Sequence, residues 1–220
     1  MARIENILFD LDGTLTDPGI GIVSTIRQVI AEMGVAAPAA AELRWCMGPP
    51  LIDVFTHLLE PAGKRELASR AASLYMQRYA VAGATQSTPY AGVEAMLERL
   101  RGKARMYVAT NKSGAIAERI IVACLGARAL GRYFEEVVGN ARFEDKSEAV
   151  RGLMERARMD PVATAIVGDR EHDVLAGKRC GISTVGVTYG YGSREELVAA
   201  GADYIADDPA AVARYLLGRI

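Results

Sequence analysis

Six apolar runs of strand length recur along this chain, and they constrain its fold more than any other feature. Longer segments with the apolar spacing of helices separate the runs. Each run is continuously apolar, which predicts strands covered on both faces, as in a parallel sheet joined by crossover helices. We therefore predict a doubly wound α/β core. The runs are IENILF (4–9), RMYVAT (105–110), EVVG (136–139), TAIVGD (164–169), STVGVTY (183–189) and ADYIA (202–206).

One long stretch departs from this alternation of strands and helices. From Pro18 to about Ser87 the apolar residues have helical spacing, and we find no convincing strand. Asp17 is the expected N-cap of the first helix, with Pro18 in its first turn. We expect an all-helical insertion at residues 18–86 and a discontinuous core formed by residues 1–17 and 87–220.

The composition excludes several classes of protein. Lys and Arg total 26 against 27 for Asp and Glu, so the chain has no strong positive field for a nucleic acid backbone, and we expect no nucleic acid partner. No run approaches the roughly 18 apolar residues that span a bilayer, so we expect no membrane partner. The three cysteines lack paired or metal-type spacing, which favours a reduced, cytoplasmic protein.

Polar side chains gather where the predicted strands end. In an open α/β sheet ligands bind beyond the carboxyl ends of the strands, so these side chains are expected on one rim. Asp10 and Asp12 would project to the same side if the first strand continued through them. The candidates, in chain order, are Asp10, Asp12, Thr110, Asn111, Lys146, Asp169 and Asp173.

The charges in this set suggest the ligand. Three or four carboxylates that face one point are destabilising unless a cation lies among them, and an all-oxygen set with room for water suits Mg²⁺. Mg²⁺ together with a lysine and hydroxyl or amide donors is also what a phosphoryl group needs. We therefore predict that the ligand is a phosphate ester, namely a small phosphorylated metabolite.

These residues resemble the motifs of the haloacid dehalogenase superfamily of phosphatases, and the resemblance covers essentially the whole chain. DLDGTLTD (10–17) is similar to the first motif, and the Thr of VATN (108–111) to the second. Lys146 is similar to the third motif, and GDREHD (168–173) to the fourth, in the family's order. The helical insertion between the first two motifs is similar to the family's cap domain.

The resemblance implies a role for each candidate. Asp10 would be the nucleophile that forms an aspartyl-phosphate, and Asp12 the general acid and then the general base. The second acid favours ester hydrolysis over dehalogenation, because a halide needs no proton. Mg²⁺ would be held by Asp10, the backbone carbonyl of Asp12 and Asp169, with Asp173 bracing the site.

The remaining candidates would bind the phosphoryl oxygens. The resemblance gives that role to Thr110 and Lys146, with help from the Asn111 amide. Lys112 is a second lysine near the second motif, but Lys146 falls at the expected place before the fourth. Ser147, where the family often has proline, is expected to serve as a helix N-cap.

Simpler interpretations exist for several features. Asp-Gly at 12–13 is a hairpin-turn signal, but that interpretation leaves Asp10 and the later acids unexplained. Asp169 and Asp173 suit helix capping if they are taken alone. The GYGS run at 190–193 lacks the P-loop pattern and is expected to be a plain turn. His57 and His172 are expected to be surface or packing residues.

The substrate is a finer question than the reaction. The sequences of the motifs are most similar to those of the phosphoglycolate phosphatase-like branch and its 5′-nucleotidases. The first expected substrate is therefore a nucleoside 5′-monophosphate, and the second is phosphoglycolate. The expected activity is that of a phosphatase. A phosphosugar mutase with the same core and a non-catalytic phosphate-binding module are the alternatives. The sequence leaves the oligomeric state open.

Overall fold

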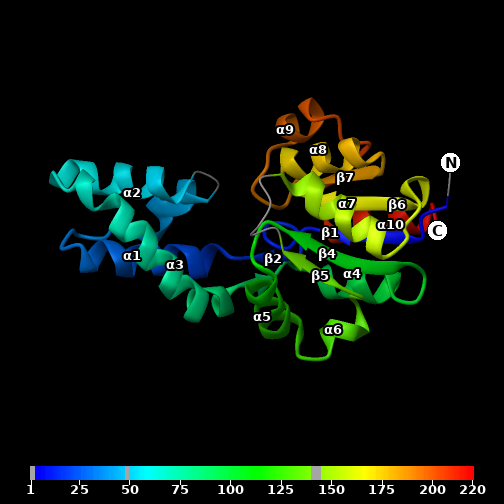
Figure 1. The fold of residues 1–220 in the computed structure, drawn as a ribbon, viewed down its shortest axis with the longest axis horizontal. Helices are drawn as coiled ribbons and strands as arrows, with labels where there is room; N and C mark the ends of the chain where they lie inside the picture. The colour runs from blue at the N-terminus through cyan, green and yellow to red at the C-terminus, as the bar shows by residue number, and fades with distance from the viewer. Residues whose placement is uncertain (1–2, 48–49, 140–144) are drawn as a thin grey trace. The chain divides into compact units, whose positions relative to one another are not determined.

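The computed structural model describes residues 3–47, 50–139 and 145–220, and its central feature is a six-stranded parallel sheet (Figure 1). The strand order is β5-β4-β1-β6-β7-β8. All six apolar runs form the strands predicted for them. Their bounds are β1 Asn6–Phe9, β4 Arg105–Thr110, β5 Val137–Gly139, β6 Thr164–Gly168, β7 Ser183–Val187 and β8 Tyr204–Ala206.

Helices cover both faces of the sheet, which confirms the doubly wound α/β prediction. On one face α7 (Lys146–Arg156) and α8 (Glu171–Cys180) pack together over Leu8, Tyr107 and Ile166. On the other side α4 (Val93–Leu100) and α10 (Pro209–Leu217) pack against each other (Figure 1). Because both faces of the sheet are buried, the strands have no polar face directed to solvent. The other core helices are α5 Gly114–Leu125, α6 Ala129–Arg132, α9 Arg194–Ala199 and the 3-10 turn Pro161–Ala163.

The strand order reverses beside β1, and this reversal positions the site. From β1 the chain builds outward through β4 and β5, then returns to the opposite side of β1 with β6, β7 and β8. β1 pairs with β4 and with β6 in register, so Phe9 lies opposite both Val108 and Val167. The ends of β1 and β6 therefore flank the switch point, where ligands of such sheets bind.

Residues Pro18–Ser87 form a second compact unit that is helical, as predicted. Three longer helices bury apolar side chains against one another, among them Ile26, Phe55 and Tyr75. Lys64 Nζ donates to the carbonyl oxygens of Met33 (2.8 Å) and Gly34 (3.1 Å), which satisfies acceptors at the end of the first helix. The elements are α1 Gly19–Glu32, α2 Leu51–Leu59 and α3 Ala68–Val81, with 3-10 turns at Ala40–Cys46, Glu60–Ala62, Arg65–Leu67 and Gly83–Gln86.

A short antiparallel ribbon joins the segments of the core that lead into and out of the helical unit. In this connector ribbon β2 (Thr16–Asp17) pairs with β3 (Thr88–Pro89). No pattern in the sequence predicts this ribbon. The expected N-cap role of Asp17 is wrong, because Asp17 belongs to β2 and Pro18 occupies the N-cap position of α1.

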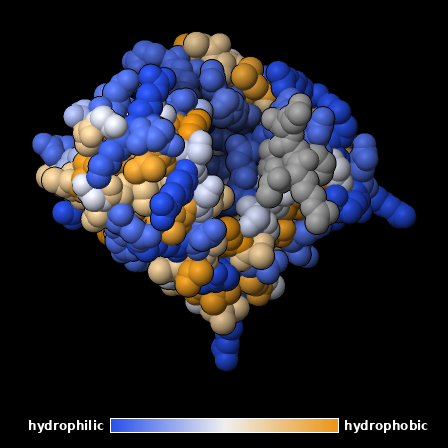
Figure 2. Space-filling model, turned by 60° about the vertical axis from the view of Figure 1, so that its left-hand side comes forward, coloured by the Kyte–Doolittle hydropathy of each residue, from blue (hydrophilic) through white to orange (hydrophobic). Residues whose placement is uncertain are grey.

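The helical unit carries several exposed apolar side chains, among them Ile20, Met76 and Val81. Polar and apolar residues are interspersed over the face of the molecule shown in Figure 2. Within the described residues, none of the helices combines the length and the apolar character needed to cross a membrane.

Candidate active site

Asp10, Lys146 and Asp173 form a buried ion-paired group at the carboxyl edge of the sheet. Asp10 directly follows β1, Lys146 is the first residue of α7, and Asp173 lies in the first turn of α8. Lys146 Nζ lies 2.6 Å from Asp10 Oδ1 and also pairs with Asp173 Oδ1. Asp173 Oδ2 accepts from the Arg170 backbone N–H at 3.1 Å, which holds the carboxylate against the start of α8.

Asp169 completes a cluster of three acids. It follows β6 and is only 1% exposed. Its Oδ2 accepts from the Tyr191 backbone N–H at 2.8 Å, and its Oδ1 accepts from the Thr14 hydroxyl at 3.3 Å. One carboxylate oxygen from each of Asp10, Asp169 and Asp173 lies within 4.8 Å of the other two. The structure thus brings together three of the four acids predicted to form the metal site.

Glycine allows the first loop to approach Asp169. Gly13 has a φ of +83°, in the left-handed region that favours glycine. A Cβ at this position would lie 2.1 Å from Asp169 Oδ2. The absence of a side chain at Gly13 leaves the space beside the acids to the carboxylate oxygens.

The charges of this cluster do not balance. When all three carboxylates are ionised, one ammonium group leaves two negative charges in a buried place, which is the charge that a divalent cation would offset. Burial raises the pKa of Asp10 to about 8, against the lowering by Lys146 and with a further rise from Asp173 and Asp169. Burial and the Asp173 charge also raise the pKa of Asp169, to about 6. The all-oxygen donor set therefore fits Mg²⁺.

Asp12 has a different environment from Asp10. β1 ends at Phe9, so the strand alternation that we extended through Asp12 does not apply. The Asp12 carboxylate is outside the three-acid cluster, and its Oδ2 pairs with Lys112 Nζ at 2.8 Å. Among the described residues its buried Oδ1 has no hydrogen-bond partner. Burial raises the pKa of Asp12, and the Lys112 charge opposes that rise.

The second motif follows the strand next to β1. Thr110 is the last residue of β4, is 3% exposed, and accepts from the Lys112 backbone N–H through Oγ1 at 3.3 Å. A hydroxyl that accepts one bond keeps its own hydrogen to donate. Asn111 follows in an exposed turn. The pairing of Lys112 with Asp12 was not predicted, because it depends on the path of two loops.

A helix N-cap that we did not predict holds the third-motif residue, Lys146, at the start of α7. Asp145 is the N-cap of α7, and its side chain accepts from the Ser147 backbone N–H at 2.9 Å. The prediction that Ser147 would be the cap is wrong, because Ser147 lies inside the helix. Lys146 consequently starts the helix, with its side chain turned to the acids.

The histidines lie at the surface. His172 is exposed at the start of α8, and exposed His57 contacts the Trp45 ring edge to face, with ring centroids 4.9 Å apart. The sequence also offers Trp45, Met47 and the GPP run (48–50) as pocket candidates, and of these Gly48 and Pro49 lie outside the described residues.

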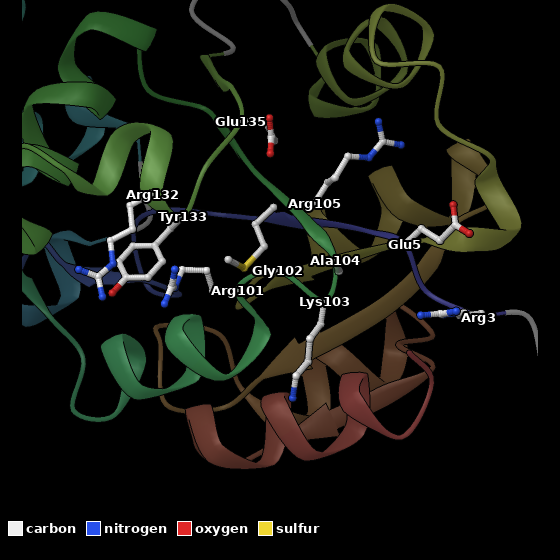
Figure 3. A pocket seen from close by; sticks show the side chains of 11 residues that line it. Arg3, Glu5, Arg101, Gly102, Lys103, Ala104, Arg105, Arg132, Tyr133 and Glu135 are labelled. Atoms are coloured by element: carbon white, nitrogen blue, oxygen red, sulfur yellow. The ribbon is translucent and has the colours of Figure 1, made fainter.

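A separate hollow of about 420 Å³ lies at the opposite, amino ends of β1 and β4 (Figure 3). Its lining is rich in basic residues, but Arg101 and Arg132 both pair with Glu98. In Figure 3 the side chains of Lys103 and Arg105 point in opposite directions. Within the described core the charges of this hollow do not converge, whereas those at the carboxyl edge do.

The comparison with known families agrees with this geometry. A family model described as haloacid dehalogenase-like hydrolase matches residues 7–187, which include most of β1, all of β4 and β6, and the acids Asp10 and Asp169. The chain belongs to this family. The match covers the core and the acids at its carboxyl edge, and it confirms the family resemblance that the motifs indicate.

Several similar proteins are named as a nucleotidase, a phosphatase or a hydrolase of this family. A 5′-nucleotidase from Pseudomonas aeruginosa is 35% identical over 97% of this chain and 96% of its own length. A phosphoglycolate phosphatase from Vibrio parahaemolyticus is 28% identical over 93% of this chain and 92% of its own. A haloacid dehalogenase-like family hydrolase from Streptococcus pneumoniae superposes with a TM-score of 0.83 at 28% identity, covering 96% of this chain and 98% of that one. The present chain is a phosphoric monoester hydrolase of this family.

Proposed function

We propose that this chain hydrolyses small phosphomonoesters through an aspartyl-phosphate on Asp10, with Mg²⁺ as its metal. The observation that carries the proposal is the environment of Asp10, whose Oδ1 is paired with buried Lys146 beside two further acids. Lys146 both holds the nucleophile in place and supplies a positive charge where phosphoryl oxygens would arrive.

The metal would be held by residues already close together. Asp10 and Asp169 would supply carboxylate oxygens and Asp12 its backbone carbonyl, while Asp173 braces Lys146 and the start of α8. Bound Mg²⁺ would neutralise charge on the phosphoryl oxygens. Gly13 keeps the space beside the carboxylates clear of a Cβ.

In the first step an oxygen of Asp10 attacks phosphorus, and the bond between phosphorus and the leaving oxygen breaks. The Asp12 carboxyl donates its proton to that oxygen, so the product leaves as a neutral alcohol. Burial raises the pKa of Asp12, which suits a group that must carry a proton. Thr110 and Asn111 would donate to the phosphoryl oxygens.

In the second step water attacks the aspartyl-phosphate. Asp12, now ionised, removes a proton from the water, and the bond between phosphorus and Asp10 breaks. The electron pair of the broken bond stays on Asp10, which returns to a carboxylate. Inorganic phosphate leaves, and Asp12 is protonated again. The pairing with Lys112 favours the ionised form of Asp12 that this step requires.

For the substrate we propose a nucleoside 5′-monophosphate first and phosphoglycolate second. The support is the similarity to a 5′-nucleotidase at 35% identity and to a phosphoglycolate phosphatase at 28%. The residues at the carboxyl edge address only phosphate and metal. We therefore propose that the helical residues 18–86 form a cap domain that selects the leaving group. We also propose that the enzyme acts in the cytoplasm.

The test is phosphate release from a panel of phosphomonoesters that includes nucleoside 5′-monophosphates and phosphoglycolate, with and without Mg²⁺. We expect Mg²⁺-dependent release by the wild type and a loss of roughly three orders of magnitude or more in kcat for Asp10→Asn. Asp203→Asn is the control, because Asp203 is an ion-paired acid beside Lys178, outside the cluster.

Three outcomes would contradict the proposal. Absence of phosphate release from every ester in the panel would overturn hydrolysis, and isomerisation of a sugar phosphate without free phosphate would favour the mutase. A ligand that binds without turnover would favour the binding module.

A further inference from the structure

The loop that follows β7 takes part in the acid cluster, although its sequence GYGS suggests only a turn. Tyr191 lies in this loop, and its backbone N–H donates to Asp169 Oδ2 at 2.8 Å. Because Thr14 donates to the other oxygen, Oδ1, the two bonds fix the rotation of the carboxylate. Tyr191 therefore sets the orientation of Asp169 from one side.

The glycines on either side of Tyr191 show how tightly the loop is fitted. A Cβ at Gly190 would lie 2.2 Å from the Gly13 carbonyl oxygen and 2.5 Å from Asp169 Cβ. A Cβ at Gly192 would lie 1.9 Å from the Asp169 carbonyl oxygen. Side chains are excluded at both positions, so the backbone of the loop rests directly on the residues of the acid cluster.

The side chain of Tyr191 anchors the same loop at another point. Its hydroxyl donates a hydrogen bond to Asp17 Oδ1. Asp17 belongs to the connector ribbon, where it pairs with Thr88. One residue thus holds Asp169 through its backbone and the connector ribbon through its phenol.

We propose that Tyr191 is a positioning residue for the metal site, and that its hydroxyl bond to Asp17 keeps the loop in the place where its N–H orients Asp169. The inference rests on the metal site of the proposed function. Loss of the phenol bond removes the anchor but leaves the N–H in the chain. The carboxylate then samples more orientations, and the cost of ordering it falls on metal binding.

The test is the affinity for Mg²⁺ alone, measured by calorimetric titration of the full chain without substrate. For Tyr191→Phe we expect the Mg²⁺ dissociation constant to rise by about three- to tenfold, less than for direct loss of a bond to a metal ligand. Asp17→Ala should have a similar effect, and the double variant should add little to either, because both changes break the bond between Tyr191 and Asp17. Asp17→Asn keeps an acceptor and should restore most of the affinity.

Tyr133→Phe is the matched control. It also removes one tyrosine hydroxyl bond to a carboxylate, from Tyr133 to Glu98 at 3.1 Å, on the side of the separate hollow. Its Mg²⁺ affinity should equal that of the wild type. Circular dichroism of each variant establishes that the fold is retained.

Three results would overturn the inference, and they are distinguishable. Equal Mg²⁺ affinity in Tyr191→Phe and the wild type would overturn the role of Tyr191 and leave the metal site standing. Equal losses in Tyr191→Phe and Tyr133→Phe would show a general effect of losing a tyrosine hydroxyl. A wild type that bound no Mg²⁺ would overturn the proposed metal site and this inference with it.

Discussion

Asp10 and Asp12 have the same side chain and lie two residues apart, yet the structure gives them different partners. Asp10 pairs with Lys146 among the acids, whereas Asp12 pairs with Lys112 and keeps one buried oxygen without a partner in the described structure. A nucleophile needs a nearby positive charge to hold it, and a proton carrier needs an oxygen directed to its substrate. The difference in partners supports the division of roles that we propose.

Asp12→Asn should separate the two chemical steps. With p-nitrophenyl phosphate the leaving group needs no proton, so Asp10 should still be phosphorylated, while attack by water loses its base. We expect a burst of about one nitrophenolate per active site followed by slow turnover, measured by stopped-flow absorbance. A variant with steady turnover at the wild-type rate and no burst would remove Asp12 from the mechanism.

Gly13→Ala should damage the site through space as well as through backbone strain. Its Cβ would lie 2.1 Å from Asp169 Oδ2, and the position has a φ of +83°. Gly102→Ala is the control, because Gly102 has a φ of +72° but nothing within 4 Å of its Cβ. We expect Gly102→Ala to lose about 1 kcal/mol of unfolding free energy, and Gly13→Ala to lose roughly 1–3 kcal/mol more, together with its Mg²⁺ response.

Chemical denaturation of the two glycine variants measures this difference. Equal losses would mean that only the positive φ matters. Unchanged Mg²⁺ binding in Gly13→Ala would mean that the close approach to Asp169 is without consequence for the site.

The residues that the sequence could predict are those whose chemistry is unusual where they stand. Acids that end apolar strands have no structural reason to be there, so Asp10 and Asp169 stood out, and the structure brings both together with Lys146 and Asp173. Thr14 and Tyr191 are ordinary residues in their local sequence. Their contacts with Asp169 depend on how two loops fold over each other, which no local pattern reports.

At the scale of the element, helix α7 presents Lys146 because its first turn is fixed by Asp145. This N-cap accepts from Ser147 N–H, and that bond lowers the pKa of Asp145. Asp145→Ala should cost about 1 kcal/mol of stability and should raise KM, because Lys146 would lose its support. Asp145→Asn retains a cap and should be close to the wild type.

Asp208→Ala is the matched control for this cap. Asp208 caps α10 by accepting from Ala211 N–H at 2.6 Å, and α10 carries none of the predicted site residues. We expect a similar loss of stability in thermal denaturation with KM unchanged. An equal effect on KM in both variants would show that Asp145 acts only through global stability.

Strand-forming segments were predictable for a reason that the connector ribbon lacks. A strand buried on both faces needs several consecutive apolar residues, and β1, β4 and β6 have them. β2 and β3 contain two residues each and pair only because the chain leaves and re-enters the core at neighbouring points. The same lack of a pattern made Asp17 look like a helix cap.

At the scale of the whole molecule, the parallel topology gathers residues that are far apart in the sequence. Asp10 and Lys146 are separated by 136 positions, yet their side chains meet because β1 lies inside the sheet and α7 packs over it. The strand order places the ends of β1 and β6 at the switch point, and so places Asp10 near Asp169. The fold thereby concentrates charge that it does not itself neutralise.

Because the acid cluster has two more negative than positive charges when its carboxylates are ionised, the stability of the whole molecule should depend on Mg²⁺. A ligand that binds only the folded state stabilises it by about 2.7 kcal/mol at a hundredfold excess over its dissociation constant, so the wild type should melt at a higher temperature with Mg²⁺ than with a chelator. Asp169→Asn removes one of the repelling charges, and Asn retains an acceptor for Tyr191 N–H. This variant should melt at or above the wild-type temperature without metal but should lose the rise caused by Mg²⁺.

Asp203→Asn should show the opposite pattern in the same scanning calorimetry. Asp203 pairs with Lys178 and accepts from Thr184 N–H at 2.8 Å, outside the acid cluster, so its loss lowers stability without metal and leaves the Mg²⁺ increment intact. Asp169→Asn should lose only the rise in melting temperature caused by Mg²⁺, whereas Asp203→Asn should lose only stability in the absence of metal. The two variants therefore separate stability from metal binding. If Mg²⁺ raised the melting temperature of Asp169→Asn as much as that of the wild type, the stabilising ion would bind elsewhere, and the charge balance of the cluster would need another explanation.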